Sequence, residues 1–315
     1  MSSDARADGL DVALEEALAG ASSVVGVGIG TDHLPSILAA RRRAEGETWR
    51  LCCTRGVVES LGRSFVLGTD VATAVETGLV AIRTPESGAS TGDGSGSPAA
   101  DDGSAAHDRT YLVADGRVHA LAGPAGDRSL ATTTDPETVH GLRAAATERF
   151  EVSRPADVGM PPRGRLYRTA REALDERFAA DLERLLEPLE PGALDRSRTV
   201  TDRTVLVALG ARHDLLFHDV RVWAESTGIA SRQSFTADRR ALVACGVIET
   251  VKVPLGIGHP NYRLRALDDR LLGVPARQLV AALREWLDGV DVDELSADDD
   301  RHRPDDDRPV WDRRS

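Results

Sequence analysis

The stretch from Thr201 to Leu267, TDRTVLVALGARHDLLFHDVRVWAESTGIASRQSFTADRRALVACGVIETVKVPLGIGHPNYRLRAL, decides the fold of the C-terminal half of this chain. Three short patterns with apolar residues at helical spacing are separated by turn residues. Two β-rich runs follow them, on either side of a Pro/Gly/His/Asn loop. The order helix, helix, helix, strand, loop, strand is typical of a winged helix-turn-helix, which the stretch therefore predicts.

The third helical pattern has start and stop signals. Ser231 is expected to cap its N-terminus by accepting a backbone hydrogen bond. Gly246 stands just past Leu242 and Val243, where a left-handed residue usually ends a helix. Gly228 gives the preceding turn the conformational freedom that it needs. These signals predict a short helix after a tight turn.

The outer face of this third helix has the chemistry of base recognition. Phe235 and Leu242 point inward at i and i+7. The residues on the opposite side that we expect to contact DNA are Ser231, Arg232, Gln233, Thr236 and Arg240. Arginine can fork onto guanine and glutamine can pair with adenine from a helix in the major groove. Arg239 stands where an aliphatic residue is usual, so either its stem packs inside or its head pairs with an acid.

The last two runs of this stretch, VIETVKV and NYRLRAL, alternate apolar and polar residues, which predicts a two-stranded wing. Basic and polar side chains along the wing are suited to phosphate contacts that position a protein without reading sequence. The expected phosphate contacts are Lys252, His259 and Arg263, with Asn261 and Arg265 beside them. A three-helix core with a hairpin also occurs in protein-interaction modules, which is the alternative.

The chain as a whole is acidic. Its formal net charge is -12, and of its 39 basic residues only Lys252 is a lysine. Such a composition is typical of proteins from salt-accumulating cells, because carboxylates hold hydration when salt strengthens the hydrophobic effect; GC-rich coding is the alternative explanation. From Thr199 to Leu267, nine Lys/Arg oppose six Asp/Glu, a net charge of +3. The winged-helix stretch is therefore a basic island, as DNA binding requires.

The sequence shows no targeting segment and no cysteine framework. No stretch approaches the roughly 20 apolar residues of a membrane span, and the polar start lacks the apolar core of a secretory signal. We therefore expect a cytoplasmic protein. Cys52, Cys53 and Cys245 fit neither a disulfide pattern nor metal-ligand spacing, so we expect buried thiols rather than a redox sensor.

The N-terminal half alternates between strand and helix patterns. Strands are expected at 21–29, 48–54, 64–69 and 79–84, and helices at 32–46, 56–63 and 71–78. Such alternation predicts βαβ units and a mainly parallel sheet. The run TYLVADGRVHALAGP adds an antiparallel hairpin through Asp115-Gly116. A helix follows from Thr134 to Val152, with Thr134 or Asp135 as its cap.

These patterns predict an α/β sheet domain followed by a winged helix-turn-helix domain. The expected division is 1–152 for a sensory or dimerisation domain with a disordered insertion at 85–109, 153–200 for a linker with a connecting helix at 169–188, 201–288 for the winged helix with its C-terminal helix, and 289–315 for a disordered acidic tail. The apolar stripe of the connecting helix packs on one domain or forms a dimer seam.

Candidate ligand-binding residues lie where the predicted parallel strands end. Thr31, Asp32 and Arg55 are the first candidates for a small-molecule site, because ligands of open α/β sheets bind at the carboxyl ends of strands. The pairs Thr69-Asp70 and Arg83-Thr84 fall at equivalent predicted ends. Any such fold places polar residues there, so the alternative is an ordinary solvated edge.

Motifs for catalysis and cofactors are incomplete. Gly26, Gly28 and Gly30 follow a strand, but the third position of a dinucleotide fingerprint is a threonine. We find no nucleophile elbow, HExxH or phosphate loop, and His213 and His218 lack further ligands at metal spacing. We therefore expect no cofactor, metal or enzyme activity. The alternative is a cytoplasmic α/β enzyme or nucleotide-binding protein with a winged-helix interaction module.

Four segments resemble one family: VVGVGIGTDHL, YLVADGRVHAL, TTTDPETVHGLRAAATERFE and LLFHDVRVWAESTGIASRQSFTADRRALVACGVIE. Through them the chain resembles the TbsP-like haloarchaeal transcriptional regulators over nearly its full length outside 85–109 and the tail. The resemblance implies control of sugar-metabolism genes, particularly the switch between glucose and gluconeogenesis. We therefore expect double-stranded promoter DNA as a partner and a homodimer.

The middle of the chain is also similar to the effector half of TrmB-type sugar-responsive regulators. In that half a similar hairpin and Asp-Pro helix belong to a phospholipase-D-like scaffold. The paired His-x-Lys motifs of phospholipase D cannot occur in a chain with one lysine, so hydrolysis is not implied. The resemblance leaves a sugar phosphate or related metabolite as a candidate effector and weakens the inference of a ligand site.

Overall fold

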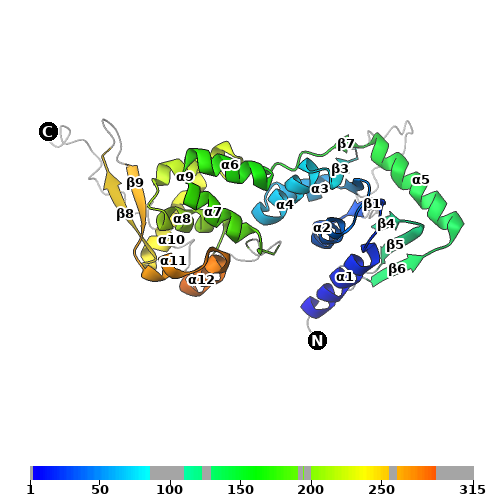
Figure 1. The fold of residues 1–315 in the computed structure, drawn as a ribbon, viewed down its shortest axis with the longest axis horizontal. Helices are drawn as coiled ribbons and strands as arrows, with labels where there is room; N and C mark the ends of the chain where they lie inside the picture. Colours follow the sequence, from blue (N-terminus) through cyan, green and yellow to red (C-terminus); the bar gives the residue numbers. More distant parts are fainter. Residues whose placement is uncertain are drawn as a thin grey trace, which may run out of the picture. The chain divides into compact units, whose positions relative to one another are not determined.

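The computed structural model in Figure 1 describes residues 3–85, 110–122, 129–190, 194, 200–254 and 261–288. The chain divides into two compact units, Met1–Pro162 and Arg163–Ser315. The acidic tail predicted at 289–315 lies outside the described residues, as does the insertion predicted at 85–109 apart from Pro85.

The first unit is built on a seven-stranded sheet in the order β6-β5-β4-β1-β2-β3-β7 (Figure 1). The strands are β1 (Val24–Ile29), β2 (Trp49–Cys53), β3 (Val80–Thr84), β4 (Tyr111–Ala114), β5 (Arg117–Ala122), β6 (Ser129–Thr133) and β7 (Arg154–Pro155). Only β1, β2 and β3 pair in parallel, and the other pairings are antiparallel. The prediction of a mainly parallel sheet was therefore wrong, because the strand expected at 64–69 is a helix and the unexpected strands β6 and β7 add antiparallel pairings at the two edges.

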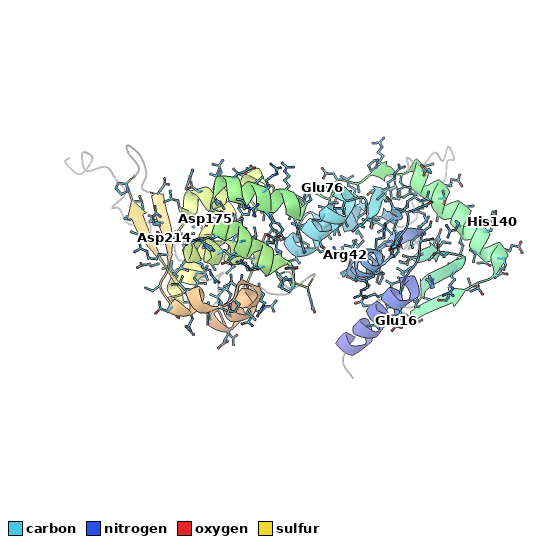
Figure 2. All side chains as sticks on the ribbon, in the orientation of Figure 1. Glu16, Arg42, Glu76, His140, Asp175 and Asp214 are labelled. Atoms are coloured by element: carbon cyan, nitrogen blue, oxygen red, sulfur yellow. The ribbon has the colours of Figure 1, made fainter. Side chains whose placement is uncertain are left out.

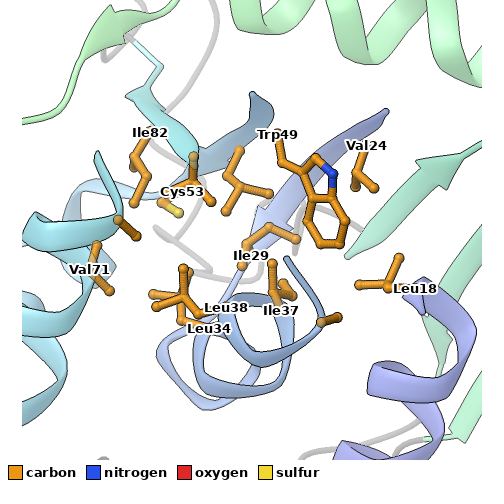
Figure 3. Packing of buried hydrophobic residues seen from close by; sticks show 14 of the residues in the cluster. Leu18, Val24, Ile29, Leu34, Ile37, Leu38, Trp49, Cys53, Val71 and Ile82 are labelled. Carbon is orange, nitrogen blue, oxygen red and sulfur yellow. The ribbon is translucent and has the colours of Figure 1, made fainter. Parts of the chain in front are cut away.

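Helices cover both faces of this sheet. They are α1 (Ser3–Leu18), η1 (Thr31–His33), α2 (Leu34–Arg43), α3 (Arg55–Leu61), α4 (Phe65–Glu76) and α5 (Pro136–Val152). The larger core packs α1, α2, α3 and α4 against one face of the sheet, and Figure 3 shows Leu18, Leu34, Val71 and Trp49 as members of this cluster. On the other face α5 packs through Ala146 and Phe150. The predicted α/β sheet domain is confirmed.

The strand predicted at 64–69 was wrong. Residues Phe65 to Glu76 form one helix, and Thr69 and Asp70 lie buried inside it. Gly68 allows α4 to approach the end of α3, because a Cβ there would lie 2.2 Å from the Leu61 carbonyl oxygen. Nearly every residue in the first half of this helix is buried. A short apolar run that is buried on all sides looks the same in a strand and in a helix, so its pattern could not distinguish the two.

The predicted hairpin and closing helix of this unit are confirmed. Asp115 and Gly116 take φ values of 36° and 84° between β4 and β5, as a type I′ turn requires. The Asp135 carboxylate accepts the Thr138 backbone N–H at 2.9 Å and caps α5. Pro136 opens this helix, where its missing N–H costs nothing.

The second unit contains the winged helix and two helices before it. Its elements are α6 (Arg163–Ala173), α7 (Glu176–Leu186), α8 (Asp202–Arg212), α9 (Phe217–Ser226), η2 (Arg232–Ser234), α10 (Phe235–Ala244), β8 (Ile248–Val253), β9 (Asn261–Ala266), α11 (Asp269–Gly273), η3 (Ala276–Gln278) and α12 (Leu279–Trp286). Strands β8 and β9 form the antiparallel hairpin that the sequence predicts. The winged helix-turn-helix fold is confirmed.

The single connecting helix expected at 169–188 is two helices. Asp175, labelled in Figure 2, interrupts it, because its carboxylate accepts the backbone N–H groups of Arg177 and Phe178 at 2.7 and 3.2 Å and so starts α7. The Trp223 indole N–H donates to the Thr169 hydroxyl at 3.2 Å, and Phe178 lies edge-on to Trp223. Helices α6 and α7 therefore pack against α9 within the second unit.

Candidate nucleic-acid interface

A buried carboxylate fixes the third helix of the winged helix, α10, to the start of α8. Asp238 is 3% exposed and accepts hydrogen bonds from the hydroxyls of Thr201 and Thr204 at 2.7 and 2.6 Å. It also accepts one from Arg203 Nε at 3.0 Å. Thr201 and Thr204 form the capping box of α8. Because Asp238 and Phe235 anchor one side of α10, its other side is free to face outward.

The turns on either side of α10 follow the sequence prediction with one exception. Gly228 and Gly246 take φ values of 83° and 65°, the left-handed conformation expected at both positions. The Ser231 side chain, however, makes no capping hydrogen bond. Residues 232–234 form a 3-10 turn and α10 begins at Phe235, so the predicted Ser231 cap was wrong. Instead, the Ser234 hydroxyl donates to the Ser231 carbonyl at 2.7 Å.

The predicted inner and outer faces of this helix are observed. Phe235 and Leu242 are both fully buried. Among the candidate DNA contacts, Ser231, Arg232 and Gln233 are exposed, and Thr236 and Arg240 are half-buried. Arg232 is not an isolated cation, because its Nε lies 2.5 Å from a carboxylate oxygen of Glu225 on α9. Any phosphate or base that binds Arg232 has to compete with this ion pair.

The wing candidates differ in what they contact. Lys252 is exposed on β8. Arg263 on β9 donates to the Asp214 carbonyl at 2.8 Å and lies 3.2 Å from its carboxylate, so it holds the wing against the turn between α8 and α9 (Figure 2). Arg265 also reaches Asp214, at 3.3 Å. His259 lies outside the described residues.

The unusual arginine of α10 stacks on aromatic rings. The guanidinium carbon of Arg239 lies 5.2 Å from the centre of the Phe217 ring and 5.0 Å from the centre of the Tyr262 ring. Both distances are in the range of a cation–π contact. Arg239 therefore links α9, α10 and β9. At a position where an aliphatic residue is usual, its guanidinium lies over two aromatic rings.

The first unit brings only part of the predicted strand-end set together. Thr31 and Asp32 lie in η1, and Arg55 opens the neighbouring α3, where it pairs with Glu59 at 3.0 Å. Asp70, by contrast, is in α4 and pairs with Arg42 of α2 at 2.6 Å (Figure 2). The pair Thr69-Asp70 is thus no strand end, because the expected strand is a helix.

Two further features of this edge are structural. Arg83 donates to the carbonyls of Phe150 and Glu151, each at 3.1 Å, and so satisfies the C-terminal end of α5. Gly28 has φ 69° at a bulge in β1, and a Cβ on Gly26 would lie 3.0 Å from the Ile29 side chain. Gly28 therefore allows the bulge in β1, and Gly26 allows the Ile29 side chain to pack closely against the strand.

The described residues contain neither a metal cluster nor a membrane-spanning helix. Across the described residues, no group of three or more His, Cys, Asp or Glu side chains could hold a metal ion. Over the same parts of the chain, no helix is long and apolar enough to cross a membrane. His213 contacts Asp181 at 3.1 Å, and His218 is exposed on α9.

Two features of the site were not predicted from the sequence: the role of Asp238 and the aromatic partners of Arg239. An acid three residues after Phe235 lies on the buried side of the helix, which is the one signal that marked Asp238 for a partner. Phe217 and Tyr262 are 45 positions apart in the chain, and only the fold places both rings beside the same guanidinium. Sequence spacing carries no sign of that contact.

The capped three-helix core, the antiparallel wing and the outward polar face of α10 define a winged helix-turn-helix domain, a class of domain that binds DNA. The comparisons agree with this geometry. Residues 162–284 match the family model described as "Transcriptional regulator TbsP-like, C-terminal HTH domain". The second unit thus contains a domain similar to the C-terminal HTH domain of TbsP-like transcriptional regulators. Neither the curated proteins nor the solved structures gave a match.

Proposed function

We propose that this regulator recognises promoter DNA by placing η2 and α10 in the major groove. The observation that carries the proposal is the outward face of these two elements, opposite fully buried Phe235 and Leu242. The proposed base-reading residues are Arg232, Gln233, Thr236 and Arg240. Their donors and acceptors match the edges of guanine and adenine in that groove.

We assign contacts with the DNA phosphate backbone to residues that flank the base-reading face. Exposed Lys252 on β8 and the exposed hydroxyl of Ser231 contact phosphates directly. Arg263 contributes through its position beside Asp214, so a phosphate shares its guanidinium with that carboxylate. His259 is proposed as a wing contact from its place in the sequence alone.

The finer function that we propose is control of sugar-metabolism genes, including the switch between glucose and gluconeogenesis, in a haloarchaeon. The acidic composition with a single lysine supports the halophilic origin. Chromatin immunoprecipitation of the full chain, from cells grown with and without glucose, tests the target genes. Enrichment of sugar-metabolism promoters that changes with glucose is expected, and enrichment unrelated to the carbon source would contradict the assignment.

A gel shift at high potassium chloride then measures binding of the protein to the promoter fragments recovered by immunoprecipitation, which tests the base-reading face. Changing Arg232 or Gln233 to Ala is expected to weaken specific binding by about 1–3 kcal/mol while unrelated duplexes are affected less. Arg168, an exposed arginine on α6, offers a matched control in Arg168→Ala. Unchanged specific binding in both reading-face variants would refute the assigned orientation of α10.

For the first unit we propose a dimerisation or metabolite-sensing role, with Thr31, Asp32 and Arg55 as the ligand candidates. Their support is the proximity of η1 and α3 beside the ends of β1 and β2. A thermal-shift series with sugar phosphates tests the effector, and light scattering tests the homodimer. No shift with any sugar phosphate, or a monomer at working concentration, would contradict the corresponding role.

A further inference from the structure

Two arginines and two aromatic rings form a cluster of cation–π contacts beside α10. The guanidinium carbon of Arg221 on α9 lies 5.1 Å from the centre of the Phe217 ring, and that of Arg239 lies 5.2 Å from the same ring. Arg239 also lies 5.0 Å from Tyr262 on the wing strand β9. We call Arg221, Phe217, Arg239 and Tyr262 the arginine–aromatic cluster. It fixes two cations at the junction of α9, α10 and β9.

The surroundings of this cluster are rich in positive charge. Burial lowers the pKa of Arg221, and the nearby Arg232 lowers it further, while Glu225 acts in the opposite direction. Glu225 is already paired with Arg232 at 2.5 Å. Within the described part of the chain, the buried Nε of Arg221 has no hydrogen-bond partner. The Glu225 carboxylate thus lies near both arginines but pairs with Arg232. Among the described residues, Arg221 therefore has no carboxylate that is not already paired with another arginine.

The contact with Phe217 prepares Arg221 to bind an anion. An arginine whose guanidinium is held over a ring has fewer orientations open to its planar fork, so less side-chain freedom is lost when the fork meets a phosphate. Phe217 is 5% exposed and forms part of the core, so the ring is a fixed support. Excess positive charge beside a recognition helix is complementary to the phosphates that flank the major groove.

We propose that the arginine–aromatic cluster is a preformed seat for a phosphate of the DNA backbone, with Arg221 as its principal contact. The inference rests on the proposed DNA binding and adds a contact from α9, which the reading face of α10 does not include. A phosphate contact from α9 would position the protein on any duplex, whatever its sequence. Base readers such as Gln233 would then act on a protein already held in place.

The test measures how the affinity of the full chain for a mixed-sequence duplex of about 30 base pairs falls with potassium chloride concentration. Loss of one phosphate contact reduces the slope of log K against log salt by about 0.9. Arg221→Gln is expected to show that reduction on specific and unrelated duplexes alike. Arg221→Lys is expected to keep the wild-type slope, because it keeps the charge. Arg168→Gln on α6, which removes an exposed arginine paired with Glu172, is expected to leave the slope unchanged.

Several results would overturn the phosphate seat. A wild-type slope in Arg221→Gln would do so, as would an equal loss in Arg221→Lys or in Arg168→Gln. If Arg221→Gln does not fold, the Nε–H resonance of Arg221 in the unmodified chain replaces it: a shift on adding the duplex supports the seat, and no shift refutes it. Absence of any duplex binding by the unmodified chain would instead overturn the proposed function itself.

Discussion

At the scale of single residues, the side chain that most controls the position of α10 is Asp238. Its carboxylate accepts hydrogen bonds from Thr201, Arg203 and Thr204 while it is 3% exposed. Asp238→Asn removes the charge and presents an amide N–H₂ to groups that are themselves donors. Hydrogen bonds to a charged group contribute about 1.5–3 kcal/mol each, so we expect the free energy of unfolding to fall by about 2–3 kcal/mol.

Urea unfolding followed by circular dichroism measures this loss. Asp219→Asn is the matched control, because Asp219 is exposed on α9 and its substitution is expected to change stability by less than about 0.5 kcal/mol. Similar midpoints for the two variants would show that Asp238 does not anchor the helix.

Single-residue roles were predictable where they depend on local geometry. The positive φ values at Gly228 and Gly246 follow from helix-end chemistry that a few neighbours determine. The role of Arg239 depends on Phe217 and Tyr262, which come from other elements, so spacing along α10 left its partner open. Ser231 failed as a cap because the chain after it forms a 3-10 turn at residues 232–234 and its side chain makes no capping hydrogen bond.

At the scale of elements, Gly68 shows how packing decides between a strand and a helix. Its Cα faces the end of α3, and an added methyl group would lie 2.2 Å from the Leu61 carbonyl oxygen and 2.7 Å from Met160 Cγ. Gly68→Ala is therefore expected to destabilise the protein by about 1–3 kcal/mol, as overpacking does, despite the better helix propensity of alanine.

Gly141 provides the matched comparison, since it lies within α5 with no atom near its added Cβ. Gly141→Ala is expected to stabilise by about 0.4–1 kcal/mol because the unfolded chain loses freedom. Thermal unfolding of both variants gives the two signs. A stabilising effect of Gly68→Ala would mean that α4 does not pack on α3 as described.

Elements with their own start and stop signals were predicted, and elements fixed by the fold were not. The helix from Pro136 to Val152 and the hairpin at Asp115-Gly116 carry caps and turn residues in the sequence. Strands β6 and β7 carry no such signal, because β6 is mostly exposed and β7 has two residues. β6 is recognised only by its pairing with β5, and β7 only by its pairing with β3, which lies about 70 residues earlier in the chain.

At the scale of the whole molecule, charge and architecture separate along the chain. The net charge of -12 contrasts with the surplus of three basic residues between Thr199 and Leu267. At molar salt the Debye length falls to about 3 Å, so the acidic remainder scarcely opposes binding of a polyanion to this basic segment. Composition could predict this separation, whereas the arrangement of α6 and α7 with the winged helix required the structure.

Each unit also contains a histidine that makes stability depend on pH: His119 is buried in the first unit and His213 is partly buried in the second. Burial lowers the pKa of His119, with a further contribution from Arg117, below its ordinary value of 6.5. Burial likewise lowers the pKa of His213 and outweighs the opposing effect of Asp181. In both cases the folded state binds fewer protons than the unfolded state when the pH falls below 6.5.

The free energy of unfolding is therefore expected to be constant above about pH 7.5 and to decrease as the pH falls through 6.5 toward the lowered pKa values. Urea midpoints at a series of pH values measure the slope, and hydrogen exchange assigns it to the unit around each histidine. His119→Gln should flatten the dependence in the first unit and His213→Gln in the second. A slope in the first unit that persists in His119→Gln would contradict its assignment to His119, and a slope in the second unit that persists in His213→Gln would contradict its assignment to His213.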